Sequence, residues 1–429
     1  MTAVATVEKV PLFASLGVRN YRLFWTGGFL SNIGTWMARV AQDWLVLTIL
    51  TDNSSLALGI VTALQFAPTA LFAPWAGTVA DRFDKRTVLL ITQAAMTITG
   101  LALAVLVLDG SVTLWQVYLL ATLQGVAAAF DGPARQAFAP EMVPRRLIAN
   151  SVGLNTTSFH AARLIGPAIA GLTVAWWGVG PALLVNALSF VAVIVALLMM
   201  RPGELTPSPV VRSKHAIRDG VAYVRQRPEI MLVMFVVFML GTFGLNFQLT
   251  NSLMATAVFN VGAEEFGYMG SVMAIGSLSA GLVAAQRTSL RLRLILGALL
   301  GFSVASMALA LAPGYLWYLV LLVPAGFLSL TVMTTANASV QLATEPEMRG
   351  RVMALYGAIF LGGTPIGSPL LGWVGEVWGP RWTLAIGGLA CLLAVGVAGL
   401  YLLRRNNWAW PGRTPEPDEP EIELGDEPR

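Results

Sequence analysis

The residues most able to do chemistry in this sequence are charged side chains inside otherwise apolar segments. Charges in such places are costly, so each one is a candidate for function. Arg39 and Asp43 are four residues apart, which on a helix puts both on one face, where they can pair. Asp43 could then take up and release protons, or the two residues could form a structural ion pair that never titrates.

Two later apolar segments contain further charges. Asp131 and Arg135 have the same i,i+4 spacing, and Arg163 lies one turn beyond His160. If Asp131 and Arg163 meet, they form a charge pair that is either structural or coupled to proton movement. His160 by itself is expected to be a hydrogen-bonded packing residue.

The sequence does not favour an enzyme. Its two histidines, His160 and His215, lie far apart in the chain, and the sequence has no cluster of metal-ligating residues. It also has no glycine-rich phosphate-binding loop with a lysine, so ATP drive is not expected. We therefore predict no cofactor and no bound metal.

The segments that carry these charges are long and apolar. The chain has 429 residues, of which 56% are hydrophobic and 12% are charged, whereas a soluble domain has about 25% charged residues. Because a membrane span needs about 20 mostly apolar residues, we expect most of the surface to face lipid. Twelve candidate spans can be placed, at residues 22–49, 56–80, 87–108, 114–138, 150–177, 181–200, 230–257, 266–286, 291–311, 315–340, 351–377 and 382–403.

Lysine and arginine fall almost wholly on one side of these spans. The loops on the other side contain only Arg381. This positive-inside bias places both termini in the cytoplasm, and we expect the protein in the plasma membrane. It also accounts for the net charge of +4 without a nucleic-acid partner. Residues 1–20 lack the apolar core of a signal peptide, so the first span is the expected insertion signal.

A polar segment at 201–229 divides the spans into two sets of six. Ile217, Val221 and Val224 recur there at helical spacing, which favours an amphipathic helix on the cytoplasmic face over a plain solvated linker. The lone Cys391 excludes an internal disulfide. We expect a cytoplasmic N-terminus at 1–21, a six-helix bundle at 22–200, the linker at 201–229, a second six-helix bundle at 230–403 and a disordered acidic tail at 404–429.

A charged turn between the second and third spans is the most specific motif. Its sequence is Gly77-Thr-Val-Ala-Asp81-Arg82-Phe-Asp84-Lys85-Arg86, which resembles the loop 2–3 signature of the major facilitator superfamily. The resemblance implies a latch that holds the two halves in one conformation, with Gly77, Asp81, Arg82, Lys85 and Arg86 as its residues. The alternative is that these charges only fix the topology.

A second motif lies in the fifth span. Ala162-Arg163-Leu-Ile-Gly166-Pro167-Ala-Ile-Ala170-Gly171 resembles the small-residue motif of drug:proton antiporters, with alanine in place of two glycines. The resemblance implies export and gives Gly166, Pro167 and Gly171 a role in helix packing. A simple proline kink is the alternative. In span four, Gln124-Gly125 resembles the end of a coupling motif whose arginine position here is Ala121.

Residues 19–403 as a whole resemble the branch of the superfamily that contains macrolide and enterobactin exporters. The segments that carry this likeness are Trp36–Leu45, Asp131–Gln136 and Gly350–Gly357. The resemblance implies an all-α integral membrane protein with twelve transmembrane helices in two pseudo-symmetric six-helix bundles. Spans one, four, seven and ten would then line a cavity, with Asn32, Trp36, Gln124, Asn246, Thr250, Thr334 and Asn337 as candidate lining residues.

These observations predict proton-coupled efflux of a hydrophobic or amphipathic small molecule by alternating access. Few fixed charges and scattered aromatic residues such as Phe66 and Phe247 suit a large amphipathic solute. The expected partners are that solute, protons and the lipid bilayer, with a monomeric protein and no nucleic acid. The alternatives are an uptake symporter or lipid flippase of the same fold, or a non-transporting scaffold or sensor that uses the acidic tail.

Overall fold

The computed structural model describes residues 11, 13–206, 216–285 and 292–405, and every regular element in these residues is a helix. Two features named above lie outside the described residues: His215 and the part of the expected acidic tail after Arg405. The first helices are α1 (Arg19–Trp44), α2 (Ser55–Arg82), α3 (Lys85–Leu108), α4 (Leu114–Phe138), α5 (Ile148–Trp177) and α6 (Val179–Leu198). The later helices are α7 (Ala216–Arg225), α8 (Pro228–Met239), α9 (Phe247–Leu253), α10 (Ala263–Ala285), α11 (Leu292–Ala310), α12 (Tyr315–Ala343), α13 (Pro346–Trp378) and α14 (Pro380–Arg405).

Nine helical segments in the described residues are long and apolar enough to cross a membrane. They are α2, α3, α6, the continuous segment Pro228–Val258, and α10 to α14. The remaining long helices, α1, α4 and α5, have 26, 25 and 30 residues. These three helices carry all the intramembrane charges named above. Charged residues lower the mean hydropathy of a helix, so these three helices are less apolar than the other nine segments.

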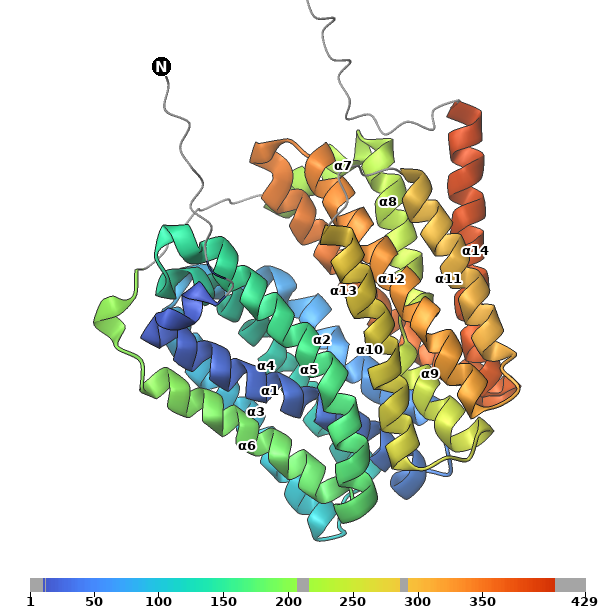
Figure 1. Cartoon of the computed structure of the whole chain (residues 1–429), viewed down its shortest axis with the longest axis horizontal. Coiled ribbons are helices and arrows are strands. Elements are labelled where there is room, and N and C mark those ends of the chain that lie inside the picture. Colours follow the sequence, from blue (N-terminus) through green and yellow to red (C-terminus); the bar gives the residue numbers. More distant parts are fainter. Residues whose placement is uncertain (1–10, 12, 207–215, 286–291, 406–429) are drawn as a thin grey trace, which may run out of the picture.

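The helices are arranged in two groups (Figure 1). Helices α1 to α6 pack together as an N-terminal group, and α8 to α14 pack together as a C-terminal group. The main contacts between the groups join α2 to α13 and α5 to α10. In each pair the start of one helix lies against the end of its partner. The two groups meet toward the lower end of the molecule in Figure 1 and separate toward the upper end, and we call the lower end the closed end.

The α5–α10 contact depends on small residues. A methyl group added at Gly171 would lie 2.6 Å from the carbonyl oxygen of Ala263, and one added at Gly270 would lie 2.9 Å from Cβ of Pro167. Separations below 3.0 Å cannot be accommodated without movement of one helix. The absence of side chains at these glycines therefore lets the two backbones touch.

The α2–α13 contact has the same construction. A methyl group at Gly59 would lie 2.5 Å from the carbonyl oxygen of Ser368, and one at Gly372 would lie 2.6 Å from the carbonyl oxygen of Ser55. At the far end of α2, a methyl group at Gly77 would meet nothing within 4 Å. The two groups are thus in close contact at the closed end, and the contact is lost toward the other end of α2.

The segment between α8 and α9 is interrupted beside this interface. Residues Leu240–Gly244 form a π-helical turn, and the chain bends before α9 begins at Phe247. Gly363 and Gly367 of α13 lie against Thr242 so closely that a methyl group at Gly367 would overlap the Thr242 carbonyl oxygen. This contact holds the bend in place, and the bend directs the residues after Leu245 toward the N-terminal group.

The segment at 201–229 contains the short helix α7, which packs on the start of α13. Asp219 of α7 forms an ion pair with Arg351 at 3.1 Å, and the Tyr223 hydroxyl accepts a hydrogen bond from the Glu345 amide at 3.1 Å. Arg227, just after α7, also pairs with Glu345. These contacts attach the linker to the C-terminal group.

We expect Gly367→Ala to lower the thermal unfolding midpoint of the purified protein by several degrees. The added methyl group must push α13 away from the bend at Thr242, and such overpacking typically costs about 1–3 kcal/mol. Scanning fluorimetry in detergent would measure the shift. Gly399→Ala is the matched control, because a methyl group at Gly399 meets nothing within 4 Å. An equal or higher midpoint for Gly367→Ala would contradict this account of the bend.

Candidate functional site

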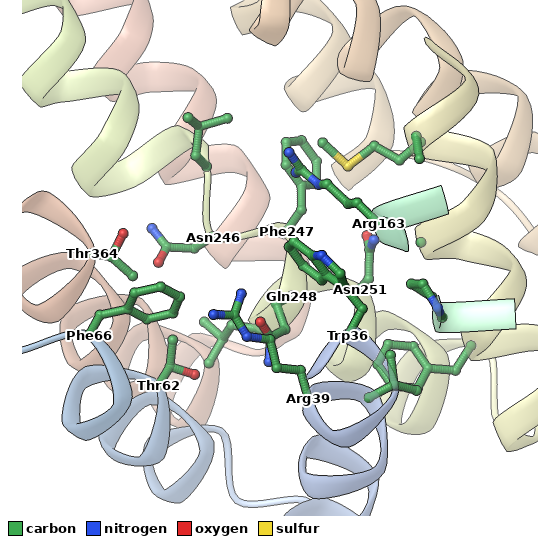
Figure 2. Close-up of a pocket in the computed structure, with 18 residues that line it drawn as sticks. Trp36, Arg39, Thr62, Phe66, Arg163, Asn246, Phe247, Gln248, Asn251 and Thr364 are labelled. Carbon is green, nitrogen blue, oxygen red and sulfur yellow. The ribbon is translucent and has the colours of Figure 1, made fainter. Parts of the chain in front are cut away.

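A cavity of about 160 Å³ lies between the two helix groups. Residues from α1, α2 and α5 line one side, and residues from the α8–α9 bend, α9, α10 and α13 line the other (Figure 2). Because both groups contribute, any change in their relative position changes the cavity. The residues labelled in Figure 2 are Trp36, Arg39, Thr62, Phe66, Arg163, Asn246, Phe247, Gln248, Asn251 and Thr364.

Two arginines and two aromatic rings form one wall of the cavity. The Cζ atom of Arg39 lies 4.8 Å from the centre of the Trp36 ring and 4.9 Å from that of Phe66. The Cζ atom of Arg163 lies 5.4 Å from the centre of the same Trp36 ring. These distances are typical of cation–π contacts, which stabilise a guanidinium that has been removed from water.

The pairing of Arg39 with Asp43 that the sequence allows is not present in this conformation. The two residues do share a face of α1, but no ion pair within 4.0 Å joins them in the described residues. Asp43 is completely buried and accepts a hydrogen bond from Nε2 of Gln248 in α9 at 3.1 Å. The carboxylate thus connects the two helix groups directly, while Arg39 turns to the aromatic rings.

The second carboxylate oxygen of Asp43 differs from the first in its contacts. Its Oδ2 atom is buried and has no hydrogen-bond partner among the described residues. Arg39 remains close enough to attract the carboxylate electrostatically. A proton could therefore bind Oδ2 without first displacing a protein hydrogen bond.

The possible pairing of Asp131 with Arg163 is also not found among the described residues. Asp131 instead pairs with Arg135 at 2.9 Å and accepts hydrogen bonds from the Thr92 hydroxyl at 3.0 Å and the Gln93 side chain at 2.7 Å. The carboxylate is satisfied within the N-terminal group, where it joins α3 to α4. This arrangement favours a structural role for Asp131 and Arg135 and leaves Arg163 for the cavity.

The charged turn after α2 is anchored within the N-terminal group. Lys85 forms an ion pair with Glu141 at 2.8 Å, and Arg86 donates a hydrogen bond to the Leu197 carbonyl oxygen at 2.8 Å. Asp84 caps α3 by accepting a hydrogen bond from the Thr87 amide. Asp81 and Arg82 are exposed. No described residue of the C-terminal group forms an ion pair or hydrogen bond with Asp81 in this conformation.

The Gly-Pro motif of α5 supports both the cavity and the closed end. A methyl group at Gly166 would lie 2.5 Å from Cβ of Trp36, so this glycine lets α1 bring Trp36 against α5. Pro167 and Gly171, on the adjacent face, contact α10. The Ser271 hydroxyl of α10 also donates a hydrogen bond to the Leu164 carbonyl oxygen at 2.7 Å. The motif therefore couples the position of the Trp36 ring to the contact between the groups.

The sequence found some of the cavity residues and missed others. Trp36 and Asn246 line the cavity as expected, whereas Asn32, Gln124, Thr250, Thr334 and Asn337 do not. Thr334 instead donates a hydrogen bond to the Leu330 carbonyl oxygen within its own helix. Thr62 and Thr364, from α2 and α13, were not predicted. In the sequence each of them is a single polar residue in an apolar segment. Many helices that line no cavity have such residues, so the sequence alone does not mark these two.

Glu376 is a further residue that the sequence analysis missed. Its Oε2 atom accepts hydrogen bonds from the Ser54 hydroxyl and the Leu56 amide, each at 3.3 Å. A carboxylate from the end of α13 thus caps the positive N-terminus of α2. This contact adds a polar seal to the glycine contacts at the closed end.

Comparisons with known proteins identify the family of this chain. The family model described as transmembrane secretion effector matches residues 11–421. The staphyloferrin A transporter of Staphylococcus aureus is 25% identical over 90% of this chain and 96% of its own length. The enterobactin exporter of Shigella boydii is 26% identical over 89% of this chain and 91% of its own.

A solved structure has the same fold. A bacterial homologue of the human lysosomal transporter Spinster, crystallised in an inward-facing and unoccupied conformation, superposes with a TM-score of 0.71 at 14% sequence identity. The superposition covers 94% of this chain and 100% of the other. The family match over residues 11–421 shows that the chain is a membrane transporter of the major facilitator superfamily. Within that superfamily it belongs to the transmembrane secretion effector family.

We expect Asp131→Ala to destabilise the protein strongly. It would leave Arg135 without its carboxylate in a largely buried site, and breaking a buried pair in this way costs about 3–5 kcal/mol. The control is Glu204→Ala, which breaks the exposed pair with Arg201 and should cost less than about 1 kcal/mol. Thermal unfolding of both variants would measure the difference. Similar small shifts for the two would contradict a structural role for Asp131.

Proposed function

We propose that this protein exports a hydrophobic or amphipathic small molecule across the plasma membrane by alternating access. Membership of the transmembrane secretion effector family supports this, as do relatives named as an enterobactin exporter, a macrolide efflux protein and a multidrug efflux pump. The observation that carries the proposal is the cavity between two helix groups that are in close contact at one end. If the two helix groups rocked about the cavity, the closed end would open and the opposite end would close.

The proposed topology has twelve spans in two six-helix bundles. The nine apolar segments together with α1, α4 and α5 make up this number. The positive-inside bias of the sequence puts both termini and the 201–229 linker in the cytoplasm. The closed end would then face outward and the cavity would open inward, as in the inward-facing Spinster homologue.

The latch would act in the opposite conformation. Gly77 has free space around it and Asp81 is exposed in the present conformation. Both lie on the side of α2 that would approach the C-terminal group when the inner end closes. In the proposed cycle, Gly77 then permits close packing and Asp81 forms its contact with a helix end of the C-terminal group.

Asp43 is the proposed proton carrier. It is buried, it contacts α9 through Gln248, and one of its oxygens has no described hydrogen-bond partner. Protonation would remove the negative charge that holds the Gln248 amide. The link between the two groups beside the cavity would weaken, so proton binding and movement of the groups would be coupled.

Transport direction tests the proposed function. Inverted membrane vesicles with an acidic lumen should accumulate the exported solute from a panel that includes a macrolide, enterobactin and an amphipathic carboxylate. Vesicles from cells that lack the protein are the control. Accumulation only in right-side-out vesicles with an inward proton gradient would identify an uptake symporter. Movement of labelled phospholipid without movement of any panel solute would identify a flippase.

We expect Asp43→Asn to abolish accumulation driven by the proton gradient and to leave exchange of labelled for unlabelled solute intact. Asparagine can still accept the hydrogen bond from Gln248 but carries no proton between the two sides. Asp109→Asn, which changes an exposed loop residue, is the matched control. Gradient-driven accumulation at the wild-type rate in the Asp43 variant would exclude this residue as the carrier.

A further inference from the structure

We propose that the cavity recognises a carboxylate group on the exported solute, and that Arg39 and Arg163 are the residues that bind it. The inference rests on the proposed function, because it assumes that the solute occupies this cavity during export. It adds a charge preference to the amphipathic character expected from the sequence. The solute class is therefore an amphipathic carboxylate with a planar or aromatic body.

The positive charge of the cavity lining favours an anionic ligand. The lining contains two arginines and no acidic residue. Neither arginine has a carboxylate within 4.0 Å among the described residues. Asp43, the nearest acid along α1, is fully buried and held by Gln248, so it does not line the cavity. The lining as a whole is positive.

Both cavity arginines have unused hydrogen-bond donors. A guanidinium carries five N–H donors and no acceptor. No described residue accepts a hydrogen bond from Arg39 or Arg163, although many other polar side chains in the helices have such partners. Charged side chains within a membrane protein normally pair with each other or with backbone carbonyl groups. Two arginines without such pairs at one cavity are what a site for an external anion requires.

Aromatic rings hold the two guanidinium groups in place. Trp36 lies between them in Figure 2, with Arg39 at 4.8 Å and Arg163 at 5.4 Å from its ring centre. The rings fix the positions of the charged groups without using their N–H donors. The two guanidinium groups carry like charges around one ring; Asp43 attracts Arg39 more strongly than Arg163 repels it, and an anion that contacts both arginines would also stabilise Arg163. A carboxylate suits this role because it can accept paired hydrogen bonds from a guanidinium.

The remaining lining describes the rest of the solute. Phe66, Phe247, Phe266 and Met273 provide an apolar surface, and the amide side chains of Asn246 and Asn251 provide a few polar contacts. Such a mixture suits an apolar or aromatic body. A cationic amphipath would fit the apolar part but would be repelled by the two arginines.

The test uses three probes that share one aromatic body and differ in charge. Pyrenebutyrate is an anion, pyrenebutanol is neutral and pyrenebutylamine is a cation at neutral pH. Binding to the full chain in nanodiscs of zwitterionic lipid is measured by equilibrium dialysis, with empty nanodiscs subtracted. We expect saturable binding of pyrenebutyrate that is at least about tenfold tighter than binding of either other probe, the size expected for a hydrogen bond to a charged group.

Single substitutions assign the preference to the two arginines. Arg163→Gln and Arg39→Gln should each weaken pyrenebutyrate binding about tenfold and change pyrenebutanol binding by less than about twofold. Arg163→Lys should retain part of the preference because it keeps the charge. Arg145→Gln, which removes an exposed positive charge far from the cavity lining, should behave like the wild type. Because each variant is compared on all three probes, a misfolded variant is recognised by the loss of pyrenebutanol binding as well.

Several results would overturn the inference. These are no saturable binding of pyrenebutyrate to the wild type, equal affinity for the three probes, or preference for the cation. Retention of the preference in both glutamine variants would also overturn it. Failure of the proposed function looks different, because selective binding of pyrenebutyrate without gradient-driven movement of any solute in vesicles would contradict export and leave the anion site standing.

Discussion

The close approach of helices at the closed end is the constraint on which the rest of this structure depends. Gly59 and Gly372 join α2 to α13, and Gly171 and Gly270 join α5 to α10, with no side chains between the backbones. Without a hydrophobic driving force between helices in lipid, such packing is a main source of association. Because it is concentrated at one end, the contact can serve as one closed state of a gate.

Close packing at glycines also determines the shape of the cavity. Gly166 sets Trp36 against α5, and the Thr242 contact with Gly367 holds the bend that brings Gln248 to Asp43. The charged groups then differ in their partners. Asp131 and Arg135 pair inside one helix group, Asp43 joins the two groups, and the two cavity arginines have no carboxylate partner among the described residues. Movement of the groups thus changes the cavity and the carboxylate link together.

The sequence predicted the class of fold well because apolar segments and sided charges are properties of the chain itself. It also identified Arg39, Asp43 and Arg163 as functional candidates, since charges within spans are costly. It could not predict their partners. The i,i+4 spacing allowed Arg39 to pair with Asp43, but Arg39 instead contacts the rings of Trp36 on the same helix and Phe66 on α2, and Asp43 contacts Gln248 on α9. Glu376 was missed because its role exists only when α2 and α13 meet.

The most direct test of the account is whether the closed end must open during transport. Ser54 and Glu376 are in hydrogen-bond contact across it, so Ser54→Cys and Glu376→Cys in a Cys391→Ser background can be joined by a short, reducible bifunctional thiol reagent. We expect joined protein to lose gradient-driven transport in inverted vesicles and to regain it after reduction, while either single cysteine has no effect. Transport at the unmodified rate by the joined protein would contradict alternating access through this end.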